Sequence, residues 1–268
     1  MKRSLPCFLF LSFLLANPAA AQTRRAVYGL QLWPEAQAEL ALPGHDYLLL
    51  AVRGQNNTDY NDSRYSNPNR FLGFDERRVT AGYEHFWNEH WSLGGTLGYY
   101  SGYGSYVVLP EVLVRHRSAI GPLTFGQRLS LERTLPGDKY ALAQTNARLR
   151  VDLEKLIALG DFGLRPRLSY QADSHVRLLK SDTDTKERTI QFTSLRGELG
   201  LRLAPEFDIT PWFAYQTAYY FALEQSGSNG IIPAARVNLV TPVLGLDIRF
   251  TLLQWHTAND RQPLPTQH

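Results

Sequence analysis

Arginine and acidic side chains recur at every second position along much of this chain. In residues 141–155, for example, Arg148, Arg150, Asp152 and Glu154 alternate with apolar residues. Positions two apart lie on one face of a β-strand, so the spacing predicts strands with one ionic and one apolar face. Such an ionic face can form ion pairs and attract small anions to its arginines. The residues that we predict to line this face are Arg115, Arg117, Arg128, Glu132, Arg148, Arg150, Asp152, Glu154, Arg165, Arg167, Arg196, Glu198, Arg202, Asp247 and Arg249.

The motifs for catalysis and metal binding in this sequence are incomplete. Ser228-Asn229-Gly230 resembles part of the motif of outer-membrane phospholipases, in which a catalytic His lies two residues before the serine, but Ser226 occupies that position here. Without that His the serine lacks a general base. Glu84-His85 and Glu89-His90 flank one turn, yet the spacing sets no third metal ligand. We therefore predict no catalytic residue, no cofactor and no metal site.

The elements that must position the ionic face are strands, because helical periodicity is almost absent after residue 22. Most of the predicted strands are longer than the five or six residues common in soluble sheets, and they suit a tilted membrane crossing of about 9–11 residues. We place them near residues 27–42, 46–55, 75–87, 91–101, 104–117, 122–134, 139–156, 162–174, 187–203, 208–224 and 236–254.

The connections between these strands alternate in length. Tight turns alternate with longer polar loops near residues 56–74, 175–186 and 225–235. This alternation is typical of outer-membrane barrels, and bacterial single-chain barrels normally have an even number of strands. We therefore predict 10–12 strands and slightly favour twelve, with a short extra strand within residues 22–42.

The start of the chain is typical of an exported protein. Met1-Lys2-Arg3 precedes an apolar run from Leu5 to Ala16, and Ala19-Ala20-Ala21 supplies the small residues of a cleavage site, so we predict a secretory signal over residues 1–21. Cys7, the one cysteine of the chain, lies inside that segment. Losing Lys2 and Arg3 lowers the formal net charge from +3 to +1, which argues against nucleic acid as a partner. We predict one barrel domain over residues 22–256 and a polar tail over residues 257–268.

The charge on the ionic face decides which face meets lipid. A lone Arg or Lys facing the bilayer midplane costs about 2–4 kcal/mol, so we predict that the ionic face is enclosed and the apolar face meets hydrocarbon. Tryptophans near strand ends or turns favour aromatic girdles at the membrane–water interfaces; they are Trp33, Trp87, Trp91, Trp212 and Trp255. The fold class that we predict is all-β, a transmembrane antiparallel up-and-down β-barrel.

Residues 243–250 resemble the terminal strand signal of outer-membrane barrels. That signal is a six-residue stretch that begins with Gly and ends with an aromatic residue, with an apolar residue two positions before the aromatic one. Here the Gly is Gly245, the aromatic residue is Phe250 and the apolar residue is Ile248. The resemblance implies recognition by the barrel-assembly machinery. This chain departs from the pattern because eighteen residues follow Phe250, whereas the family usually ends there.

The mature chain also resembles a family of uncharacterised outer-membrane barrels from Bacteroidetes and other Gram-negative bacteria. The resemblance rests on Trp33 in an early strand, Arg53 at the end of the next, and Gln127-Arg128 with Glu132-Arg133 in a middle strand. The family has no established activity that could be carried over to this chain. The resemblance implies a Gram-negative outer-membrane location and contact with lipids and lipopolysaccharide.

Three functions remain open on these grounds. The first is a non-enzymatic barrel, either structural or a narrow channel for small polar or anionic solutes, and we favour a lumen that is mostly filled by long side chains. The second is an outer-membrane lipid hydrolase or lipid-modifying enzyme, which the missing His disfavours. The third is a soluble carrier, which the charge on the enclosed face disfavours.

Overall fold

The computed structural model describes residues 23–42, 46–58, 73–102, 105–137, 143–159, 162–176, 188–204, 206–222, 224–227, 230–232 and 234–253. The predicted signal segment 1–21, the predicted tail 257–268, Trp255 and the serine of the Ser228-Asn229-Gly230 motif lie outside these ranges. Within them the chain contains no helix of the length and hydropathy that a membrane crossing requires.

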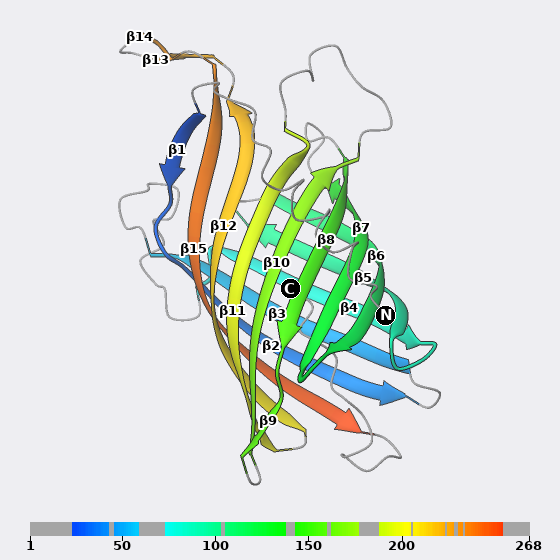
Figure 1. Ribbon diagram of the computed structural model, residues 1–268. Coiled ribbons are helices and arrows are strands. Elements are labelled where there is room, and N and C mark those ends of the chain that lie inside the picture. Colours follow the sequence, from blue (N-terminus) through cyan, green and yellow to red (C-terminus); the bar gives the residue numbers. More distant parts are fainter. Residues whose placement is uncertain are drawn as a thin grey trace, which may run out of the picture.

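Eleven strands pair edge to edge into one closed ring (Figure 1). Each strand lies beside the next in the sequence, and the pairing from the first ring strand to the last is antiparallel throughout. The ring strands are β2 (Gln31–Leu42), β3 (Asp46–Asn57), β4 (Glu76–Phe86), β5 (Trp91–Gly102), β6 (Ser105–Ile120), β7 (Leu123–Pro136), β8 (Gln144–Glu154), β10 (Phe162–His175), β11 (Ile190–Ala204), β12 (Phe207–Ala222) and β15 (Ala235–Leu253).

The ring closes through a parallel pair. Strand β15 pairs with β2 in parallel, and the register joins Val243 to Gln31 and Leu253 to Ala41. When consecutive strands alternate in direction, the first and last of an odd number point the same way, so closure has to be parallel. The predicted range of 10–12 strands holds, but the preference for twelve is wrong, and the ring is not wholly antiparallel.

Among the described residues, four short strands lie outside the ring of eleven. β1 (Thr23–Val27) pairs in parallel with the first part of β15, and Tyr28 N donates to Val240 O at 2.8 Å where the chain passes from β1 to β2. β9 (Ile157–Leu159) continues the edge of β8 along β10. β13 (Gln225–Gly227) and β14 (Gly230–Ile232) form a separate hairpin. β1 and β9 therefore lengthen strands that are already in the ring.

The two ends of the barrel differ in their connections. At one end, the short-turn end, strands are joined across residues 43–45, 87–90, 121–122, 155–161 and 205–206. At the other, the long-connection end, the connections include residues 58–75, 176–189 and 223–234. This alternation matches the prediction. It also places Thr23 and Leu253, the first and last strand residues, at opposite ends of the barrel.

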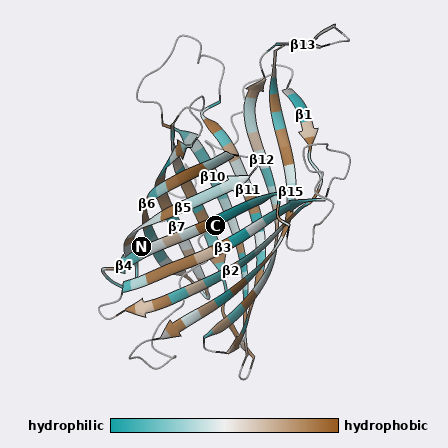
Figure 2. Cartoon of the chain, turned by 180° about the vertical axis from the view of Figure 1, so that it is seen from behind, coloured by the Kyte–Doolittle hydropathy of each residue, from teal (hydrophilic) through white to brown (hydrophobic). Residues whose placement is uncertain are grey.

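Hydrophilic and hydrophobic residues both occur along the ring strands (Figure 2), and exposure alternates along them as the sequence pattern predicts. In β10, Arg167 is 4% exposed while the next residue, Leu168, is 54% exposed. Strand β3 departs from the pattern because both of its faces are apolar: Tyr47 and Leu49 are buried while Leu48 is exposed. Tyr47 packs inside against Phe86 with ring centroids 5.5 Å apart, so part of the interior at the short-turn end is apolar.

Candidate functional site

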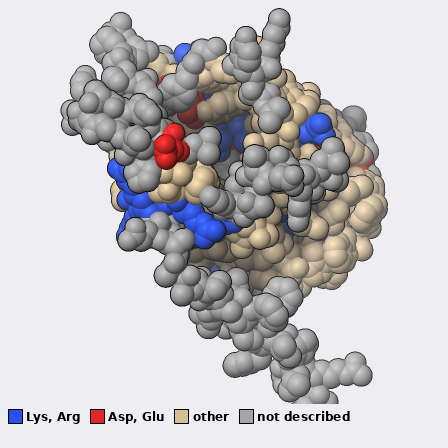
Figure 3. Space-filling model, turned by 90° about the horizontal axis from the view of Figure 1, so that it is seen from above, with Lys and Arg blue, Asp and Glu red and all other residues tan. Residues whose placement is uncertain are grey.

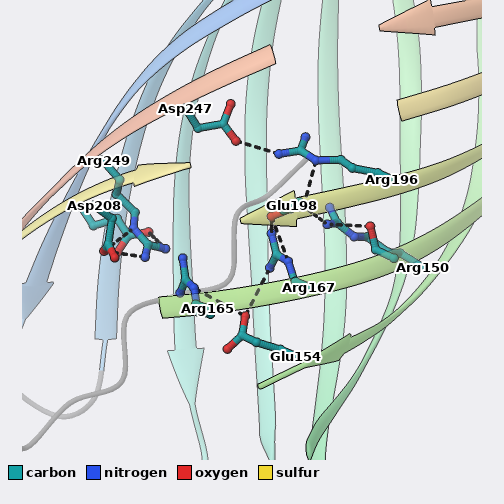
Figure 4. Close-up of polar contacts among 11 residues, drawn as sticks. Arg150, Glu154, Arg165, Arg167, Arg196, Glu198, Asp208, Asp247 and Arg249 are labelled. Atoms are coloured by element: carbon teal, nitrogen blue, oxygen red, sulfur yellow. Dashed lines mark hydrogen bonds and ion pairs between the residues drawn. The ribbon is translucent and has the colours of Figure 1, made fainter. Parts of the chain in front are cut away.

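The buried faces of six ring strands bring the predicted ionic residues together inside the barrel. Arg167 on β10 and Glu198 on β11 are directly opposite in the register, which is why their side chains meet. Arg167 Nε donates to Glu198 Oε2 at 3.0 Å, and its Nη2 contacts the same oxygen. Glu198 also pairs with Arg196 Nε at 2.8 Å and with Arg150 Nη2 at 3.4 Å. One carboxylate therefore joins three guanidinium groups (Figure 4).

The network extends from this carboxylate to the closing strand. Arg196 Nη2 contacts Asp247 Oδ2 at 2.7 Å, and Trp212 Nε1 donates to the other oxygen of Asp247 at 2.7 Å. The guanidinium of Arg196 lies over the Trp212 ring, 3.8 Å from its centroid. These contacts connect β11, β12 and β15 across the interior.

A second group of ion pairs lies near the short-turn end, since Asp208 is one residue from the start of β12 and Glu39 is three from the end of β2. Arg249 contacts Asp208 Oδ2 at 2.7 Å (Figure 4). It also lies 3.8 Å from Glu39 Oε1. Arg202 reaches the other oxygen of Asp208 at 3.4 Å. Buried ions of this kind are tolerated only when each charge has a partner, which these contacts supply.

The predicted residues on the opposite wall form a third group. Arg148 contacts three carboxylates, those of Glu111, Glu132 and Asp173, at 3.2–3.3 Å. Arg128 contacts Glu111 at 2.7 Å, which links β6, β7 and β8. The remaining predicted ionic residues lie on the same inner face: Arg165 pairs with Glu154 at 3.7 Å, Arg115 pairs with Glu84 at 3.3 Å, and Arg117 and Asp152 line a small cavity.

A larger cavity of about 290 Å³ is bordered by several of these ion-paired residues. Several of its lining residues lie in the half of the barrel nearer the long-connection end. Figure 3 views the molecule from above and shows a hollow with Lys and Arg atoms in its wall. Five arginines and three acids line the cavity, which leaves an excess of positive charge. They are Arg53, Arg78, Arg148, Arg150 and Arg196 with Glu35, Glu111 and Asp173.

Two tryptophans that were expected in a girdle line this cavity instead. Trp33 and Trp212 meet edge to face with ring centroids 6.1 Å apart, and Arg53 lies 4.6 Å from the centroid of the Trp33 ring. Each lies on the same face of its strand as a buried ionic residue: Trp33 shares a face with Glu35, and Trp212 shares a face with Asp208. The girdle prediction is therefore wrong for these two. Trp87 and Trp91 do lie exposed at the short-turn end.

The terminal strand motif has an outward and an inward part. Ile248 and Phe250 lie on the outer face of β15, and Phe250 packs against Phe207 with ring centroids 4.8 Å apart. Gly245 lies on the inner face opposite Trp212, and a Cβ built there would stand 2.1 Å from Trp212 Cε2. Gly245 therefore gives the Trp212 ring the space to lie against β15.

Six residues of the described ion-pair network were not among the predicted lining residues: Glu39, Arg78, Glu84, Glu111, Asp173 and Asp208. Each has the inward parity of its strand, so the alternation that identified the others was available for them too. Among the described residues, no cluster of three or more His, Cys, Asp or Glu side chains is arranged to hold a metal ion.

Comparisons with known proteins identify no family for this chain. The sequence matches no protein-family model and no curated protein. Among solved structures, it is similar to the NanC porin in a rhombohedral crystal form, with 12% identity over 68% of this chain and 78% of that chain and a TM-score of 0.40. A likeness this weak carries no argument about function. Membership of the uncharacterised barrel family stays a prediction.

Proposed function

We propose that this chain is a non-enzymatic outer-membrane barrel that accepts small anionic solutes through its long-connection end and is constricted at its short-turn end. The observation that carries the proposal is the 290 Å³ cavity, in which five arginines face three acids above a layer of buried ion pairs. A concave site with an excess of one sign of charge concentrates solutes of the opposite sign.

The constriction is supported by how closely the lower interior is filled. Arg249, Asp208 and Glu39 are each buried and in contact, and each comes from a different strand. Long side chains that point inward from every strand leave little free lumen in a barrel of this size. We therefore propose slow, selective passage of small anions rather than a wide pore.

Ion selectivity in planar bilayers tests this proposal. Glu35 and Arg53 are paired in the register of β2 and β3, and both line the cavity, so they form a matched pair of opposite charge. In a KCl gradient we expect wild-type barrels to prefer chloride over potassium. Arg53→Gln lowers the ratio of anion to cation permeability, and Glu35→Gln raises it.

Two results contradict the proposal. If neither wild type nor variants conduct, the barrel is a scaffold and the cavity is not part of a path. If the two substitutions shift the permeability ratio in the same direction, the cavity charge does not set selectivity.

The outward face supports an outer-membrane location, with lipids and lipopolysaccharide as its surroundings. We propose that the long-connection end faces the outside, and that the barrel-assembly machinery recognises Gly245, Ile248 and Phe250.

Cysteine labelling tests this orientation. The odd strand count puts β1 at the long-connection end, so we expect a membrane-impermeant maleimide to label Arg24→Cys in intact cells. It labels Glu206→Cys, at the short-turn end, only after the outer membrane is permeabilised. The reverse pattern contradicts this orientation.

A further inference from the structure

Three arginines lie directly opposite one another on neighbouring strands of the inner wall. The register pairs Arg115 of β6 with Arg128 of β7, and Arg128 with Arg150 of β8. All three are buried, with 4%, 7% and 5% of their surface exposed. Like charges at directly opposite positions destabilise a sheet, so this row needs negative charge close by.

The carboxylates that pair with this row come from other positions. Glu84 contacts Arg115 at 3.3 Å, and Glu111 contacts Arg128 at 2.7 Å. Even so, two buried nitrogen atoms of the row, Arg115 Nη1 and Arg128 Nε, have no hydrogen-bond partner among the described residues. A buried donor without an acceptor is costly, and more so when it is charged. These nitrogens are therefore donors in need of an acceptor.

The row borders a small cavity of about 20 Å³. Arg117 lines it too. Asp152 supplies the one carboxylate of the lining. Its Oδ2 lies 2.0 Å from where a Cβ of Gly126 would stand, so the absence of that Cβ makes room for it. Four guanidinium groups and one carboxylate thus surround the space.

The size and lining of this space determine which particle it can bind. A volume of this order holds one water-sized particle. A water molecule needs acceptors for its two hydrogens, and the Asp152 carboxylate is the one side-chain acceptor among the described lining residues, whereas the four arginine side chains only donate. A halide accepts from several donors at once and offsets the like charges of the row.

We propose that the space between Arg115, Arg117, Arg128 and Arg150 is a binding site for a single halide ion, with chloride as the natural ligand. The inference deepens the proposed anion-accepting lumen by naming a site at its base. It concerns binding, however, and can be tested apart from permeation.

Thermal unfolding of the mature barrel in detergent tests the site. At constant ionic strength, sodium chloride is titrated against sodium gluconate, whose anion is too large for the space. Chloride at about ten times its dissociation constant raises the unfolding midpoint by about 3–6 °C, and the rise saturates. Arg117→Gln abolishes the chloride response. Arg78→Gln, which removes an arginine from the larger cavity, keeps it.

The outcomes separate this site from the proposed function. Equal midpoints in chloride and gluconate for the wild type overturn the site, as does a chloride response of wild-type size in Arg117→Gln. A barrel that passes anions but shows no chloride response loses the site alone, while one that responds but does not conduct keeps it. Crystals grown in bromide locate the ion directly: an anomalous peak among the four guanidinium groups supports the site, and its absence there overturns it.

Discussion

Replacing Glu198 with Gln is the sharpest test of how the barrel interior is stabilised. The side chain of Glu198 is 2% exposed and contacts Arg150, Arg167 and Arg196. Glutamine keeps its shape and one acceptor oxygen but removes the charge. The three arginines are then left with weaker electrostatic compensation in a site that water reaches poorly.

The expected loss of unfolding free energy is about 3–5 kcal/mol, the usual cost of breaking a buried ion pair by removing one partner. Because glutamine still accepts one hydrogen bond, we expect a value near the lower limit, about 3 kcal/mol. That is a large share of a typical folding stability of about 5–15 kcal/mol. Urea unfolding in lipid vesicles, followed by tryptophan fluorescence, measures it.

A second variant distinguishes lost charge balance from lost packing. Adding Arg167→Met to Glu198→Gln removes one of the excess positive charges, so we expect the double variant to recover at least about 1 kcal/mol. Glu224→Gln, at an exposed position, serves as the control and changes stability by less than about 0.5 kcal/mol. A loss below about 1 kcal/mol in Glu198→Gln refutes the reasoning, because it means that water screens the interior.

Two further predictions concern the closing strand. Gly245→Ala places a methyl group against the Trp212 ring and lowers the unfolding free energy by about 1–3 kcal/mol in the same urea assay; no change means that the ring does not lie there. Cysteines at Ala36 and Ile248, outward partners in the parallel register, form a disulfide that non-reducing gels detect. Cysteines at Ala36 and Leu246, two residues out of register, serve as the control, and equal cross-linking there contradicts the register.

The position and direction of the ring strands could be predicted because their signals are local. The segment near residues 122–134 is found as Leu123–Pro136, and the one near 162–174 as Phe162–His175. Alternation within a strand and turn residues at its ends need no knowledge of distant partners. The same local parity identified most of the residues that form the buried ion pairs.

The closure of the barrel could not be predicted in the same way. Which strand pairs with β2 is a contact between residues more than 200 positions apart, and no local pattern encodes it. The sequence contains eleven predicted strand segments, but the even count typical of bacterial barrels favoured one more. In the structure, β1 lies beside the upper part of β15 and extends β2 instead of adding a twelfth member to the ring.

Trp33 and Trp212 show why parity outweighs residue type inside a barrel. Their type favours a membrane interface, where the ring meets apolar surroundings and the indole N–H meets water. Their parity directs them inward, because a one-residue change of face would carry Glu35 and Asp208 outward as well. Exposing those carboxylates to hydrocarbon costs more than enclosing two indoles. The interior also offers what an indole needs: Asp247 accepts the Trp212 N–H at 2.7 Å, and arginines lie over both rings. The aromatic pair in the cavity wall thus follows from the charges that share its face.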